Sequence, residues 1–264
     1  MPDVDLDGVT IHYEEAGDGP LAYVYCHGLG ANGAMFVEED LPWYAQHFRA
    51  IAWDQRGLGQ SGQAAKYSLP LYAADLARLL DHLEIDKAVV YGVSWGGYLV
   101  QRFALDYPER CAALVIDSSS SEVNATSSQD WYQRGEFARL GAKALEGLES
   151  EAAFEGHRAL DASNAPEVEP RHVDSFVAQA RAIAGTREHP LTGELHRISC
   201  PTLVVGGGAD VVAGAGGSVV LGRNIPGART EIVQDAGHGV YRDKRAVFRP
   251  LLLEFLTDNG LLSN

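Results

Sequence analysis

The sequence has little positive charge. It contains 21 Lys and Arg residues against 36 Asp and Glu residues, which gives a formal net charge of −15, and no run of basic residues occurs in it. Such an acidic chain repels both a phosphate backbone and an anionic lipid surface. We therefore expect neither nucleic acid nor a membrane as a partner, and a small-molecule substrate is favoured. The sequence leaves the oligomeric state open.

Cysteine is also scarce. Cys26, Cys111 and Cys200 lie in or beside apolar runs, and an odd number of cysteines predicts reduced, buried thiols rather than a disulfide framework. No stretch approaches the roughly 20 apolar residues that span a bilayer. The acidic segment from Met1 to Leu6 lacks the basic start and the apolar run of a signal peptide. We therefore expect a cytoplasmic protein.

The nine histidines form no HxH or HExxH cluster, and no CxxC pair is present. These spacings are the usual signatures of zinc sites. The sequence therefore predicts no metal and no other cofactor.

Apolar runs and amphipathic segments alternate along most of the chain. This alternation predicts an α/β fold, with a mostly parallel central sheet that is flanked by helices on both faces. Asp7-Gly8 is a hairpin turn signal before the first alternating strand. The strands are expected at 9–13, 21–26, 50–53, 88–91, 112–116, 200–205 and 230–233, and the helices at 71–83, 98–105 and 247–256.

The pattern is interrupted from residue 122 to residue 196. This stretch is polar, rich in alanine and punctuated by prolines, and it shows no strand periodicity. We therefore predict one core domain, formed by residues 1–121 and 197–264, with a helical insertion at 122–196.

The segment Gly92-Val93-Ser94-Trp95-Gly96 joins a predicted strand to a predicted helix. A serine in this place occupies a tight, strained turn, and the flanking glycines let other backbone pass closely. The turn lifts the hydroxyl clear of the sheet at a helix N-terminus, where negative charge is favoured. The motif predicts that Ser94 is a nucleophile.

A second glycine-containing turn, His27-Gly28-Leu29-Gly30, follows an earlier strand. Two backbone N–H groups can stabilise the oxyanion of a tetrahedral intermediate. The expected donors are the N–H of Trp95, which follows the nucleophile, and the N–H of Leu29.

A serine nucleophile needs a base, and the base needs an acid to orient it. His238 follows the last strand and is flanked by glycines, so it is the expected base. Asp210, at the end of the preceding strand, is the favoured acid. Asp117, at the end of an earlier strand, and Asp235, just before the histidine, are the alternatives.

These motifs resemble those of the α/β-hydrolase fold family over essentially the whole length. The landmarks occur in the family's order, namely His27-Gly28, the segment from Asp54 to Ser61, Ser94, Asp210 and His238. The resemblance implies a structural turn at Asp54 and Arg56 and a helical cap at 122–196. One departure is the glycine-rich stretch 211–217, where family members often carry a proline. Candidates for the inner face of the cap are Trp131, Tyr132, Phe137, Leu140, Phe154 and Phe176, and four of them, Trp131, Tyr132, Phe137 and Phe154, are the candidates for the substrate pocket.

The resemblance implies a serine hydrolase that cleaves a small carboxylic ester or lactone through an acyl-enzyme. Because the nucleophile position holds Ser94 and not Asp, relatives that cleave carbon–halogen bonds or epoxides are poor guides. Alternatives are an amidase or aminopeptidase similar to proline iminopeptidases, to which Trp95 and the segment from Trp53 to Arg56 are similar, and a C–C bond hydrolase. A non-catalytic ligand receptor on the same fold is a further alternative.

Overall fold

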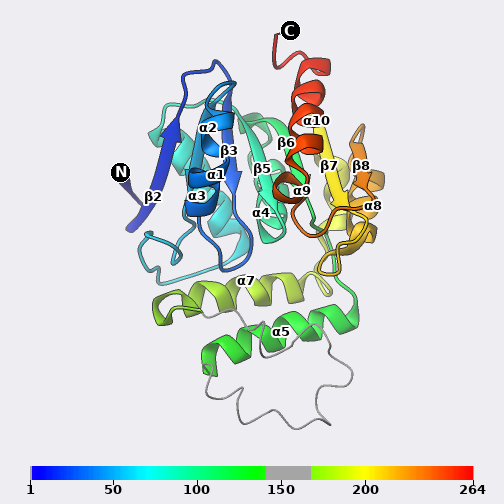
Figure 1. Ribbon diagram of the computed structural model, residues 1–264. Coiled ribbons are helices and arrows are strands. Elements are labelled where there is room, and N and C mark those ends of the chain that lie inside the picture. Colours follow the sequence, from blue (N-terminus) through cyan, green and yellow to red (C-terminus); the bar gives the residue numbers. More distant parts are fainter. Residues whose placement is uncertain (1, 141–167, 264) are drawn as a thin grey trace.

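The computed structural model describes residues 2–140 and 168–263 (Figure 1). In this part of the chain, strands form one eight-stranded sheet in the order β1-β2-β4-β3-β5-β6-β7-β8. The pairs β1–β2 and β2–β4 are antiparallel, and the remaining pairs are parallel. The strands are β1 Asp3–Leu6, β2 Val9–Ala16, β3 Ala22–Cys26, β4 Arg49–Trp53, β5 Ala88–Val93, β6 Cys111–Asp117, β7 Thr202–Gly207 and β8 Arg229–Val233.

Helices cover both faces of the sheet, as the sequence predicts for an α/β fold. One face packs against α3, α4 and α8, and the other packs against α1, α2, α9 and α10. Two further helices, α5 and α7, lie beyond one end of the strands (Figure 1). The bounds are α1 Ala34–Glu39, α2 Leu41–Tyr44, α3 Leu69–His82, α4 Trp95–Asp106, α5 Ala125–Leu140, α7 Val173–Gly185, α8 Gly214–Asn224, α9 Val240–Asp243 and α10 Arg245–Asp258.

Strand β3 shows why the central strands are continuous apolar runs. Val24 and Cys26 belong to the apolar cluster under α3 and α4, whereas Tyr23 and Tyr25 belong to the cluster under α10. Successive side chains of a strand point to opposite faces, so a sheet that is covered on both faces needs apolar residues at every position. All five residues of β3 are accordingly buried.

Most predicted elements are present, with bounds shifted by a few residues. The hairpin turn at Asp7-Gly8 joins β1 to β2, and both turn residues have positive φ, 58° and 82°. Helix α4 begins at Trp95, three residues before its predicted start. Helix α8 was not predicted, because its sequence is rich in glycine, which disfavours helices. The predictions also omitted α1, α2 and α9.

Helices α5 and α7 pack against each other. A Cβ atom built on Gly135 of α5 would lie 3.5 Å from the Cβ of Ala180 in α7, which is ordinary van der Waals contact. The described residues between 122 and 196 contain no strand. The boundaries of the inserted segment stay a prediction.

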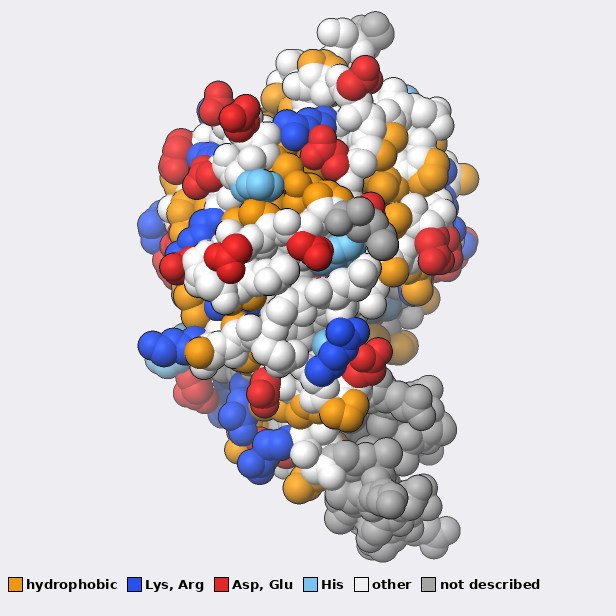
Figure 2. Space-filling model, turned by 90° about the vertical axis from the view of Figure 1, so that its left-hand side faces the viewer, with side chains coloured by type: hydrophobic (Ala, Val, Ile, Leu, Met, Phe, Trp, Pro, Cys, Tyr) orange, Lys and Arg blue, Asp and Glu red, His pale blue; other side chains and the backbone are white. Residues whose placement is uncertain are grey.

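Acidic and basic side chains are interspersed on the face shown in Figure 2, and neither sign forms a continuous patch there. Among the helices that the structure describes, none has the length and apolar character needed to cross a membrane.

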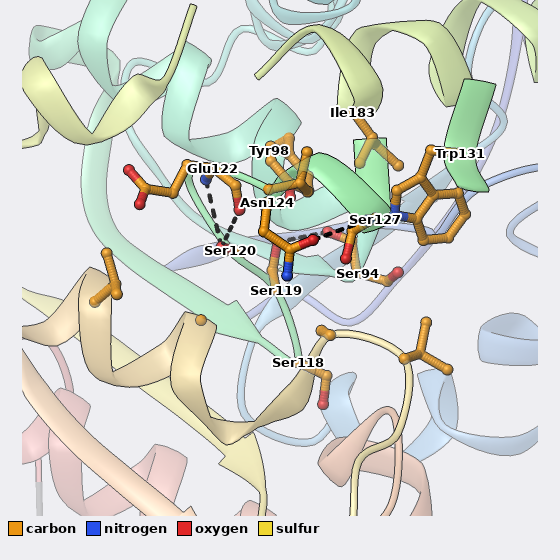
Figure 3. Close-up of a pocket in the computed structure, with 15 residues that line it drawn as sticks. Ser94, Tyr98, Ser118, Ser119, Ser120, Glu122, Asn124, Ser127, Trp131 and Ile183 are labelled. Carbon is orange, nitrogen blue, oxygen red and sulfur yellow. Dashed lines mark hydrogen bonds between the residues drawn. The ribbon is translucent and has the colours of Figure 1, made fainter. Parts of the chain in front are cut away.

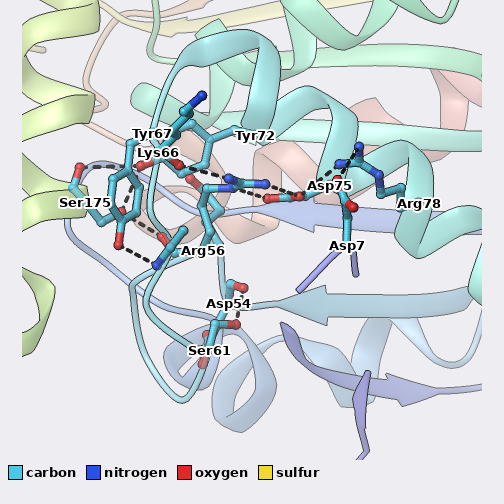
Figure 4. Close-up of polar contacts among 12 residues, drawn as sticks. Asp7, Asp54, Arg56, Ser61, Lys66, Tyr67, Tyr72, Asp75, Arg78 and Ser175 are labelled. Carbon is cyan, nitrogen blue, oxygen red and sulfur yellow. Dashed lines mark hydrogen bonds and ion pairs between the residues drawn. The ribbon is translucent and has the colours of Figure 1, made fainter. Parts of the chain in front are cut away.

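A buried ion pair fixes the segment that follows β4. The Arg56 guanidinium donates Nε–H to Asp75 Oδ2 at 2.5 Å and Nη2–H to Asp75 Oδ1 at 2.6 Å (Figure 4). The Asp75 side chain, on α3, is fully buried. Burial raises the pKa of Asp75, against the opposing effect of the Arg56 charge. The expected structural role of Arg56 agrees with these contacts.

We predict that Asp75→Ala lowers the free energy of unfolding by about 3–5 kcal/mol, because it leaves the Arg56 guanidinium buried without its carboxylate. Urea denaturation measures the change. The control is Asp81→Ala on the same helix, where the carboxylate pairs with Arg110 but is 65% exposed. That variant should lose no more than about 1 kcal/mol. Equal losses in the two variants would contradict the assignment.

Candidate active site

Ser94 lies on a strained turn between β5 and α4. Its backbone angles are φ 55° and ψ −117°, a conformation that a residue with a side chain rarely adopts. Two glycines make the turn possible. A Cβ on Gly92 would lie 2.1 Å from the carbonyl oxygen of Gly96, and a Cβ on Gly96 would lie 2.1 Å from that of Cys26. The glycines of the motif therefore have the steric role that the sequence predicts.

The glycine turn after β3 lies beside Ser94. A Cβ on Gly28 would be 3.6 Å from the Cβ of Ser94. Among the described residues, the N–H groups of Leu29 and Trp95 have no hydrogen-bond acceptor. Trp95 N–H is also the first N–H group of α4, where the helix dipole favours negative charge. Two unused donors therefore lie close to the serine.

His238 is hydrogen-bonded to Asp210. Its Nδ1–H donates to Asp210 Oδ2 at 2.9 Å, which leaves Nε2 free to accept a proton. The Asp210 side chain is 1% exposed and that of His238 is 29% exposed. The other carboxylate oxygen, Oδ1, accepts N–H groups from Val212 at 2.8 Å and Ala213 at 3.0 Å. The glycine-rich stretch after Asp210 thus supplies backbone donors that hold the carboxylate.

The environment of Asp210 favours its charged form. Burial acts to raise its pKa, but the hydrogen bond and charge of His238, together with the Val212 and Ala213 N–H groups, hold the pKa below its ordinary value. A carboxylate that stays ionised can orient an imidazole and stabilise its protonated form.

Asp117, the main alternative acid, makes different contacts. Its Oδ1 accepts Ser118 Oγ–H and Val240 N–H, and its Oδ2 accepts Tyr91 O–H and Tyr241 N–H, all within 3.1 Å. Burial raises the pKa of this fully buried carboxyl, against the effect of these donors. Two of these hydrogen bonds go to the N-terminus of α9, and none goes to His238.

The segment Asp117-Ser118 also connects the serine to the histidine loop. Ser94 N–H donates to the Asp117 carbonyl oxygen at 2.9 Å, and Gly239 N–H donates to Ser118 Oγ at 2.9 Å. A Cβ on Gly239 would lie 3.7 Å from Val93. Within the described residues, the hydrogen bonds of His238 do not include Ser94. The structure thus places the residues next to Ser94 and His238 in contact.

A cavity of about 290 Å³ opens beside Ser94 (Figure 3). In Figure 3, Trp131 and Ile183 lie together, and Ser120 and Glu122 lie at the opposite side. The lining combines apolar and hydrogen-bonding side chains. It consists of Ser94, Tyr98, Ser118, Ser119, Ser120, Glu122, Val123, Asn124, Ser127, Trp131, Ile183, Val212, Ala213, Gly217 and Val220.

The aromatic candidates for the pocket occupy different places. Trp131 lines the cavity. Tyr132 is 50% exposed and lies outside the lining, with the guanidinium of Arg181 5.8 Å from its ring centroid. Phe137 is half-buried and is not part of the lining, and Phe154 lies outside the described residues.

The other two aromatic or apolar candidates also lie outside the lining. Leu140 is exposed, and Phe176 is buried against Gly30. Sequence reasoning did not assign the run from Ser118 to Ser120 to the pocket. Its position directly after a buried strand was the available signal, because the carboxyl ends of parallel strands form ligand sites.

Among the described residues, no group of three His, Cys, Asp or Glu side chains is arranged to hold a metal ion. The three cysteines are free thiols, and Cys200, unlike the other two, is only half-buried.

The geometry agrees with a comparison of the sequence with known families. Residues 24–244 match the family model of the alpha/beta hydrolase fold. The chain belongs to the α/β-hydrolase family. The family assignment confirms the fold, and proteins similar to this α/β-hydrolase carry the names of hydrolases.

Three relatives cover nearly the whole chain. A poly(3-hydroxyalkanoate) depolymerase of Ectopseudomonas oleovorans is 30% identical over an alignment of 246 residues, and the match covers 87% of this chain and 82% of the depolymerase. A 3-oxoadipate enol-lactonase of Acinetobacter baylyi is 25% identical over an alignment of 237 residues, and the match covers 86% of this chain and 85% of the lactonase. The solved structure of an N-acyl homoserine lactone degrading enzyme has a TM-score of 0.74 at 30% identity, and the match covers 96% of this chain and all of that one.

We predict that Gly96→Ala lowers the free energy of unfolding by about 3 kcal/mol or more, because the new methyl group overlaps the backbone of Cys26 and His27. Thermal denaturation followed by circular dichroism measures the loss. Gly185→Ala, at the end of α7, is the control, because nothing lies within 4 Å of its Cβ. It should be neutral or stabilising by up to about 1 kcal/mol. An unchanged Tm for Gly96→Ala would contradict the close packing.

Proposed function

We propose that this protein hydrolyses a small carboxylic ester or lactone through an acyl-enzyme, with Ser94 as nucleophile, His238 as base and Asp210 as acid. The observation that carries the proposal is the 2.9 Å hydrogen bond from His238 Nδ1 to Asp210, in a loop that contacts the turn of Ser94. That bond selects the tautomer in which Nε2 is unprotonated and able to take the proton of a serine hydroxyl.

In the first half-reaction, Ser94 Oγ attacks the carbonyl carbon while His238 Nε2 removes its proton. Negative charge develops on the former carbonyl oxygen, and the N–H groups of Leu29 and Trp95 stabilise it. The protonated imidazole, stabilised by the Asp210 carboxylate, then donates its proton to the departing alkoxide. The alcohol, or the opened end of a lactone, leaves the acyl group on Ser94.

In the second half-reaction, His238 removes a proton from a water molecule that attacks the acyl-enzyme. The same two N–H groups stabilise the second oxyanion. Collapse of this intermediate breaks the bond to Ser94 Oγ, and the imidazolium returns the proton to the serine. The carboxylic acid is released and the resting enzyme is restored, so each turnover consumes one water molecule and requires no cofactor.

Two of the three relatives described above are named for acting on lactones. Those names support an ester or lactone substrate for this chain. The cavity of about 290 Å³ suits a small molecule. Its side with Trp131 and Ile183 favours an apolar group, and its serine-rich side favours a group that accepts or donates hydrogen bonds.

The inserted segment 122–196 serves as the cap of this hydrolase. Helix α5 contributes Ser127 and Trp131 to the cavity, and α7 contributes Ile183. Substrate selection in this arrangement depends on the cap residues, since the reacting groups come from the core. The proposed location is the cytoplasm.

We predict that a fluorophosphonate probe labels the wild-type protein and that Ser94→Ala abolishes the labelling, because the probe bonds to an activated serine oxygen. Intact-protein mass spectrometry detects the adduct. Ser119→Ala is the control, because Ser119 also lines the cavity, and it should still be labelled. Labelling of Ser94→Ala would refute the nucleophile.

A panel of p-nitrophenyl esters, lactones and a prolyl anilide then distinguishes the hypothesis of an ester or lactone substrate from the hypothesis of an aminopeptidase. We expect steady-state turnover of esters or lactones and little of the anilide. Binding without turnover would indicate a receptor.

We predict that Asp210→Asn lowers kcat by about 10⁴-fold, because the amide favours the wrong tautomer of His238. Asp117→Asn should instead lower the free energy of unfolding by about 1–3 kcal/mol, since an amide cannot accept all four donors, and should retain most of the activity. Ester kinetics and urea denaturation of the two variants test this difference. The reverse pattern would make Asp117 the acid.

A further inference from the structure

Two buried glutamines connect the turn His27–Gly30, here called the oxyanion turn because it carries the N–H of Leu29, to the turn of Ser94 and to α7. Gln55, which follows β4, and Gln179, on α7, are fully buried. Gln55 Oε1 accepts the indole N–H of Trp95 at 2.7 Å and an amide N–H of Gln179 at 3.0 Å. An indole N–H can only donate, so this contact fixes which way the Gln55 amide faces and, through it, the orientation of Gln179.

The Gln179 amide also holds the turn that carries Leu29. Its Oε1 accepts the N–H of Gly30 at 2.9 Å. One turn earlier on α7, Phe176 lies against the same glycine, because a Cβ on Gly30 would be 2.6 Å from the Phe176 ring. Gly30 has a φ of +65°. Helix α7 therefore constrains the residue directly after Leu29 by packing and by a hydrogen bond.

Gln55 holds the other side of the turn. Its Nε2 donates to the carbonyl oxygen of His27 at 3.0 Å, and its backbone N–H donates to His27 Nε2 at 3.1 Å. The His27 Nδ1–H then donates to the carbonyl oxygen of Gly28 at 2.9 Å. Burial lowers the pKa of His27, which agrees with a neutral ring that accepts at Nε2. The residues before and after Leu29 are thus both fixed by the glutamine pair.

We propose that Gln55 and Gln179 are positioning residues that hold the Leu29 N–H in place as an oxyanion donor and couple α7 to the reacting centre. The inference rests on the proposed function. A glutamine suits this position because its amide both donates and accepts, so it can bridge a backbone N–H and a second amide inside the protein. An oxyanion donor acts only when it lies about 2.7–3.1 Å from the developing charge, so a small shift of the turn reduces its effect.

The main test is Gln179→Met, which keeps the length of the side chain and removes its hydrogen bonds to Gly30 and to Gln55. Complete loss of an oxyanion donor costs about 10²–10³ in rate, and a displaced donor keeps part of its effect, so we expect kcat to fall about 30-fold. KM should change by less than about twofold, because the donor acts mainly in the transition state. Phenylboronic acid, a tetrahedral analogue, should bind more weakly by a factor similar to the loss in kcat.

Ser175→Ala is the matched control on the same helix. Ser175 is fully buried, hydrogen-bonds to the Tyr72 hydroxyl at 2.8 Å and donates to the Arg56 carbonyl oxygen at 2.8 Å (Figure 4). It makes no hydrogen bond to the oxyanion turn. Its substitution should lower Tm as Gln179→Met does. It should leave kcat and boronate affinity within about twofold of wild type, because both quantities report how well the site stabilises the transition state and Ser175 makes no hydrogen bond to the oxyanion turn.

The double variant Gln55→Met/Gln179→Met gives a second readout. Because both glutamines act on one turn, the double variant should lose little more kcat than the more damaged single variant. The rate of fluorophosphonate labelling provides the same comparison without any choice of substrate, since the phosphoryl oxygen occupies the oxyanion position.

The proposal is overturned if Gln179→Met keeps kcat and labelling rate within about threefold of Ser175→Ala, a difference too small for a displaced oxyanion donor. It is also overturned if the loss appears in KM alone, or if the two glutamine variants are additive. Wild type and Ser94→Ala are measured in parallel. Unlabelled wild type, or labelled Ser94→Ala, refutes the proposed function itself, whereas a reactive wild type with an unaffected Gln179→Met refutes only the positioning role.

Discussion

The close contact between the first turn of α4 and the end of β3 underlies the whole site. Gly96 approaches the carbonyl oxygen of Cys26 so closely that no side chain fits between them. This contact presses the turn of Ser94 against the turn that begins at His27. The serine is therefore raised above the sheet beside two free backbone donors, and the strain in its backbone is retained because packing on both sides leaves it no other conformation.

Asp117 connects the turn of Ser94 to the loop that carries His238. Its carbonyl oxygen accepts the N–H of Ser94, and its carboxylate binds the first N–H groups of α9, directly after the loop of His238. A buried carboxylate is costly unless it is well hydrogen-bonded, and four donors satisfy this one. A charge that would otherwise destabilise the core is thereby satisfied, and the same residue links the turn of Ser94 to the start of α9.

The cavity beside Ser94 is built largely from other elements than this frame. The sheet, the serine turn and the Asp210–His238 pair come from core elements, whereas the cavity is lined largely by the serine run after β6 and by α5, α7 and α8. Helix α7 belongs both to the cavity and to the frame around Ser94. It lines the cavity with Ile183, and through Gln179 it holds the oxyanion turn.

The sequence by itself determined the parallel sheet and the place of Ser94, because apolar runs and the segment Gly92–Gly96 at a strand-to-helix junction are patterns that neighbouring residues form. Tertiary structure decided the rest. Asp117 and Asp210 both follow buried strands and are alike in sequence, and only the folded chain shows that Asp210 meets His238. The bond from Gly30 to Gln179 spans 149 residues. Such contacts depend on how whole helices and strands pack, and no local pattern of residues specifies that packing.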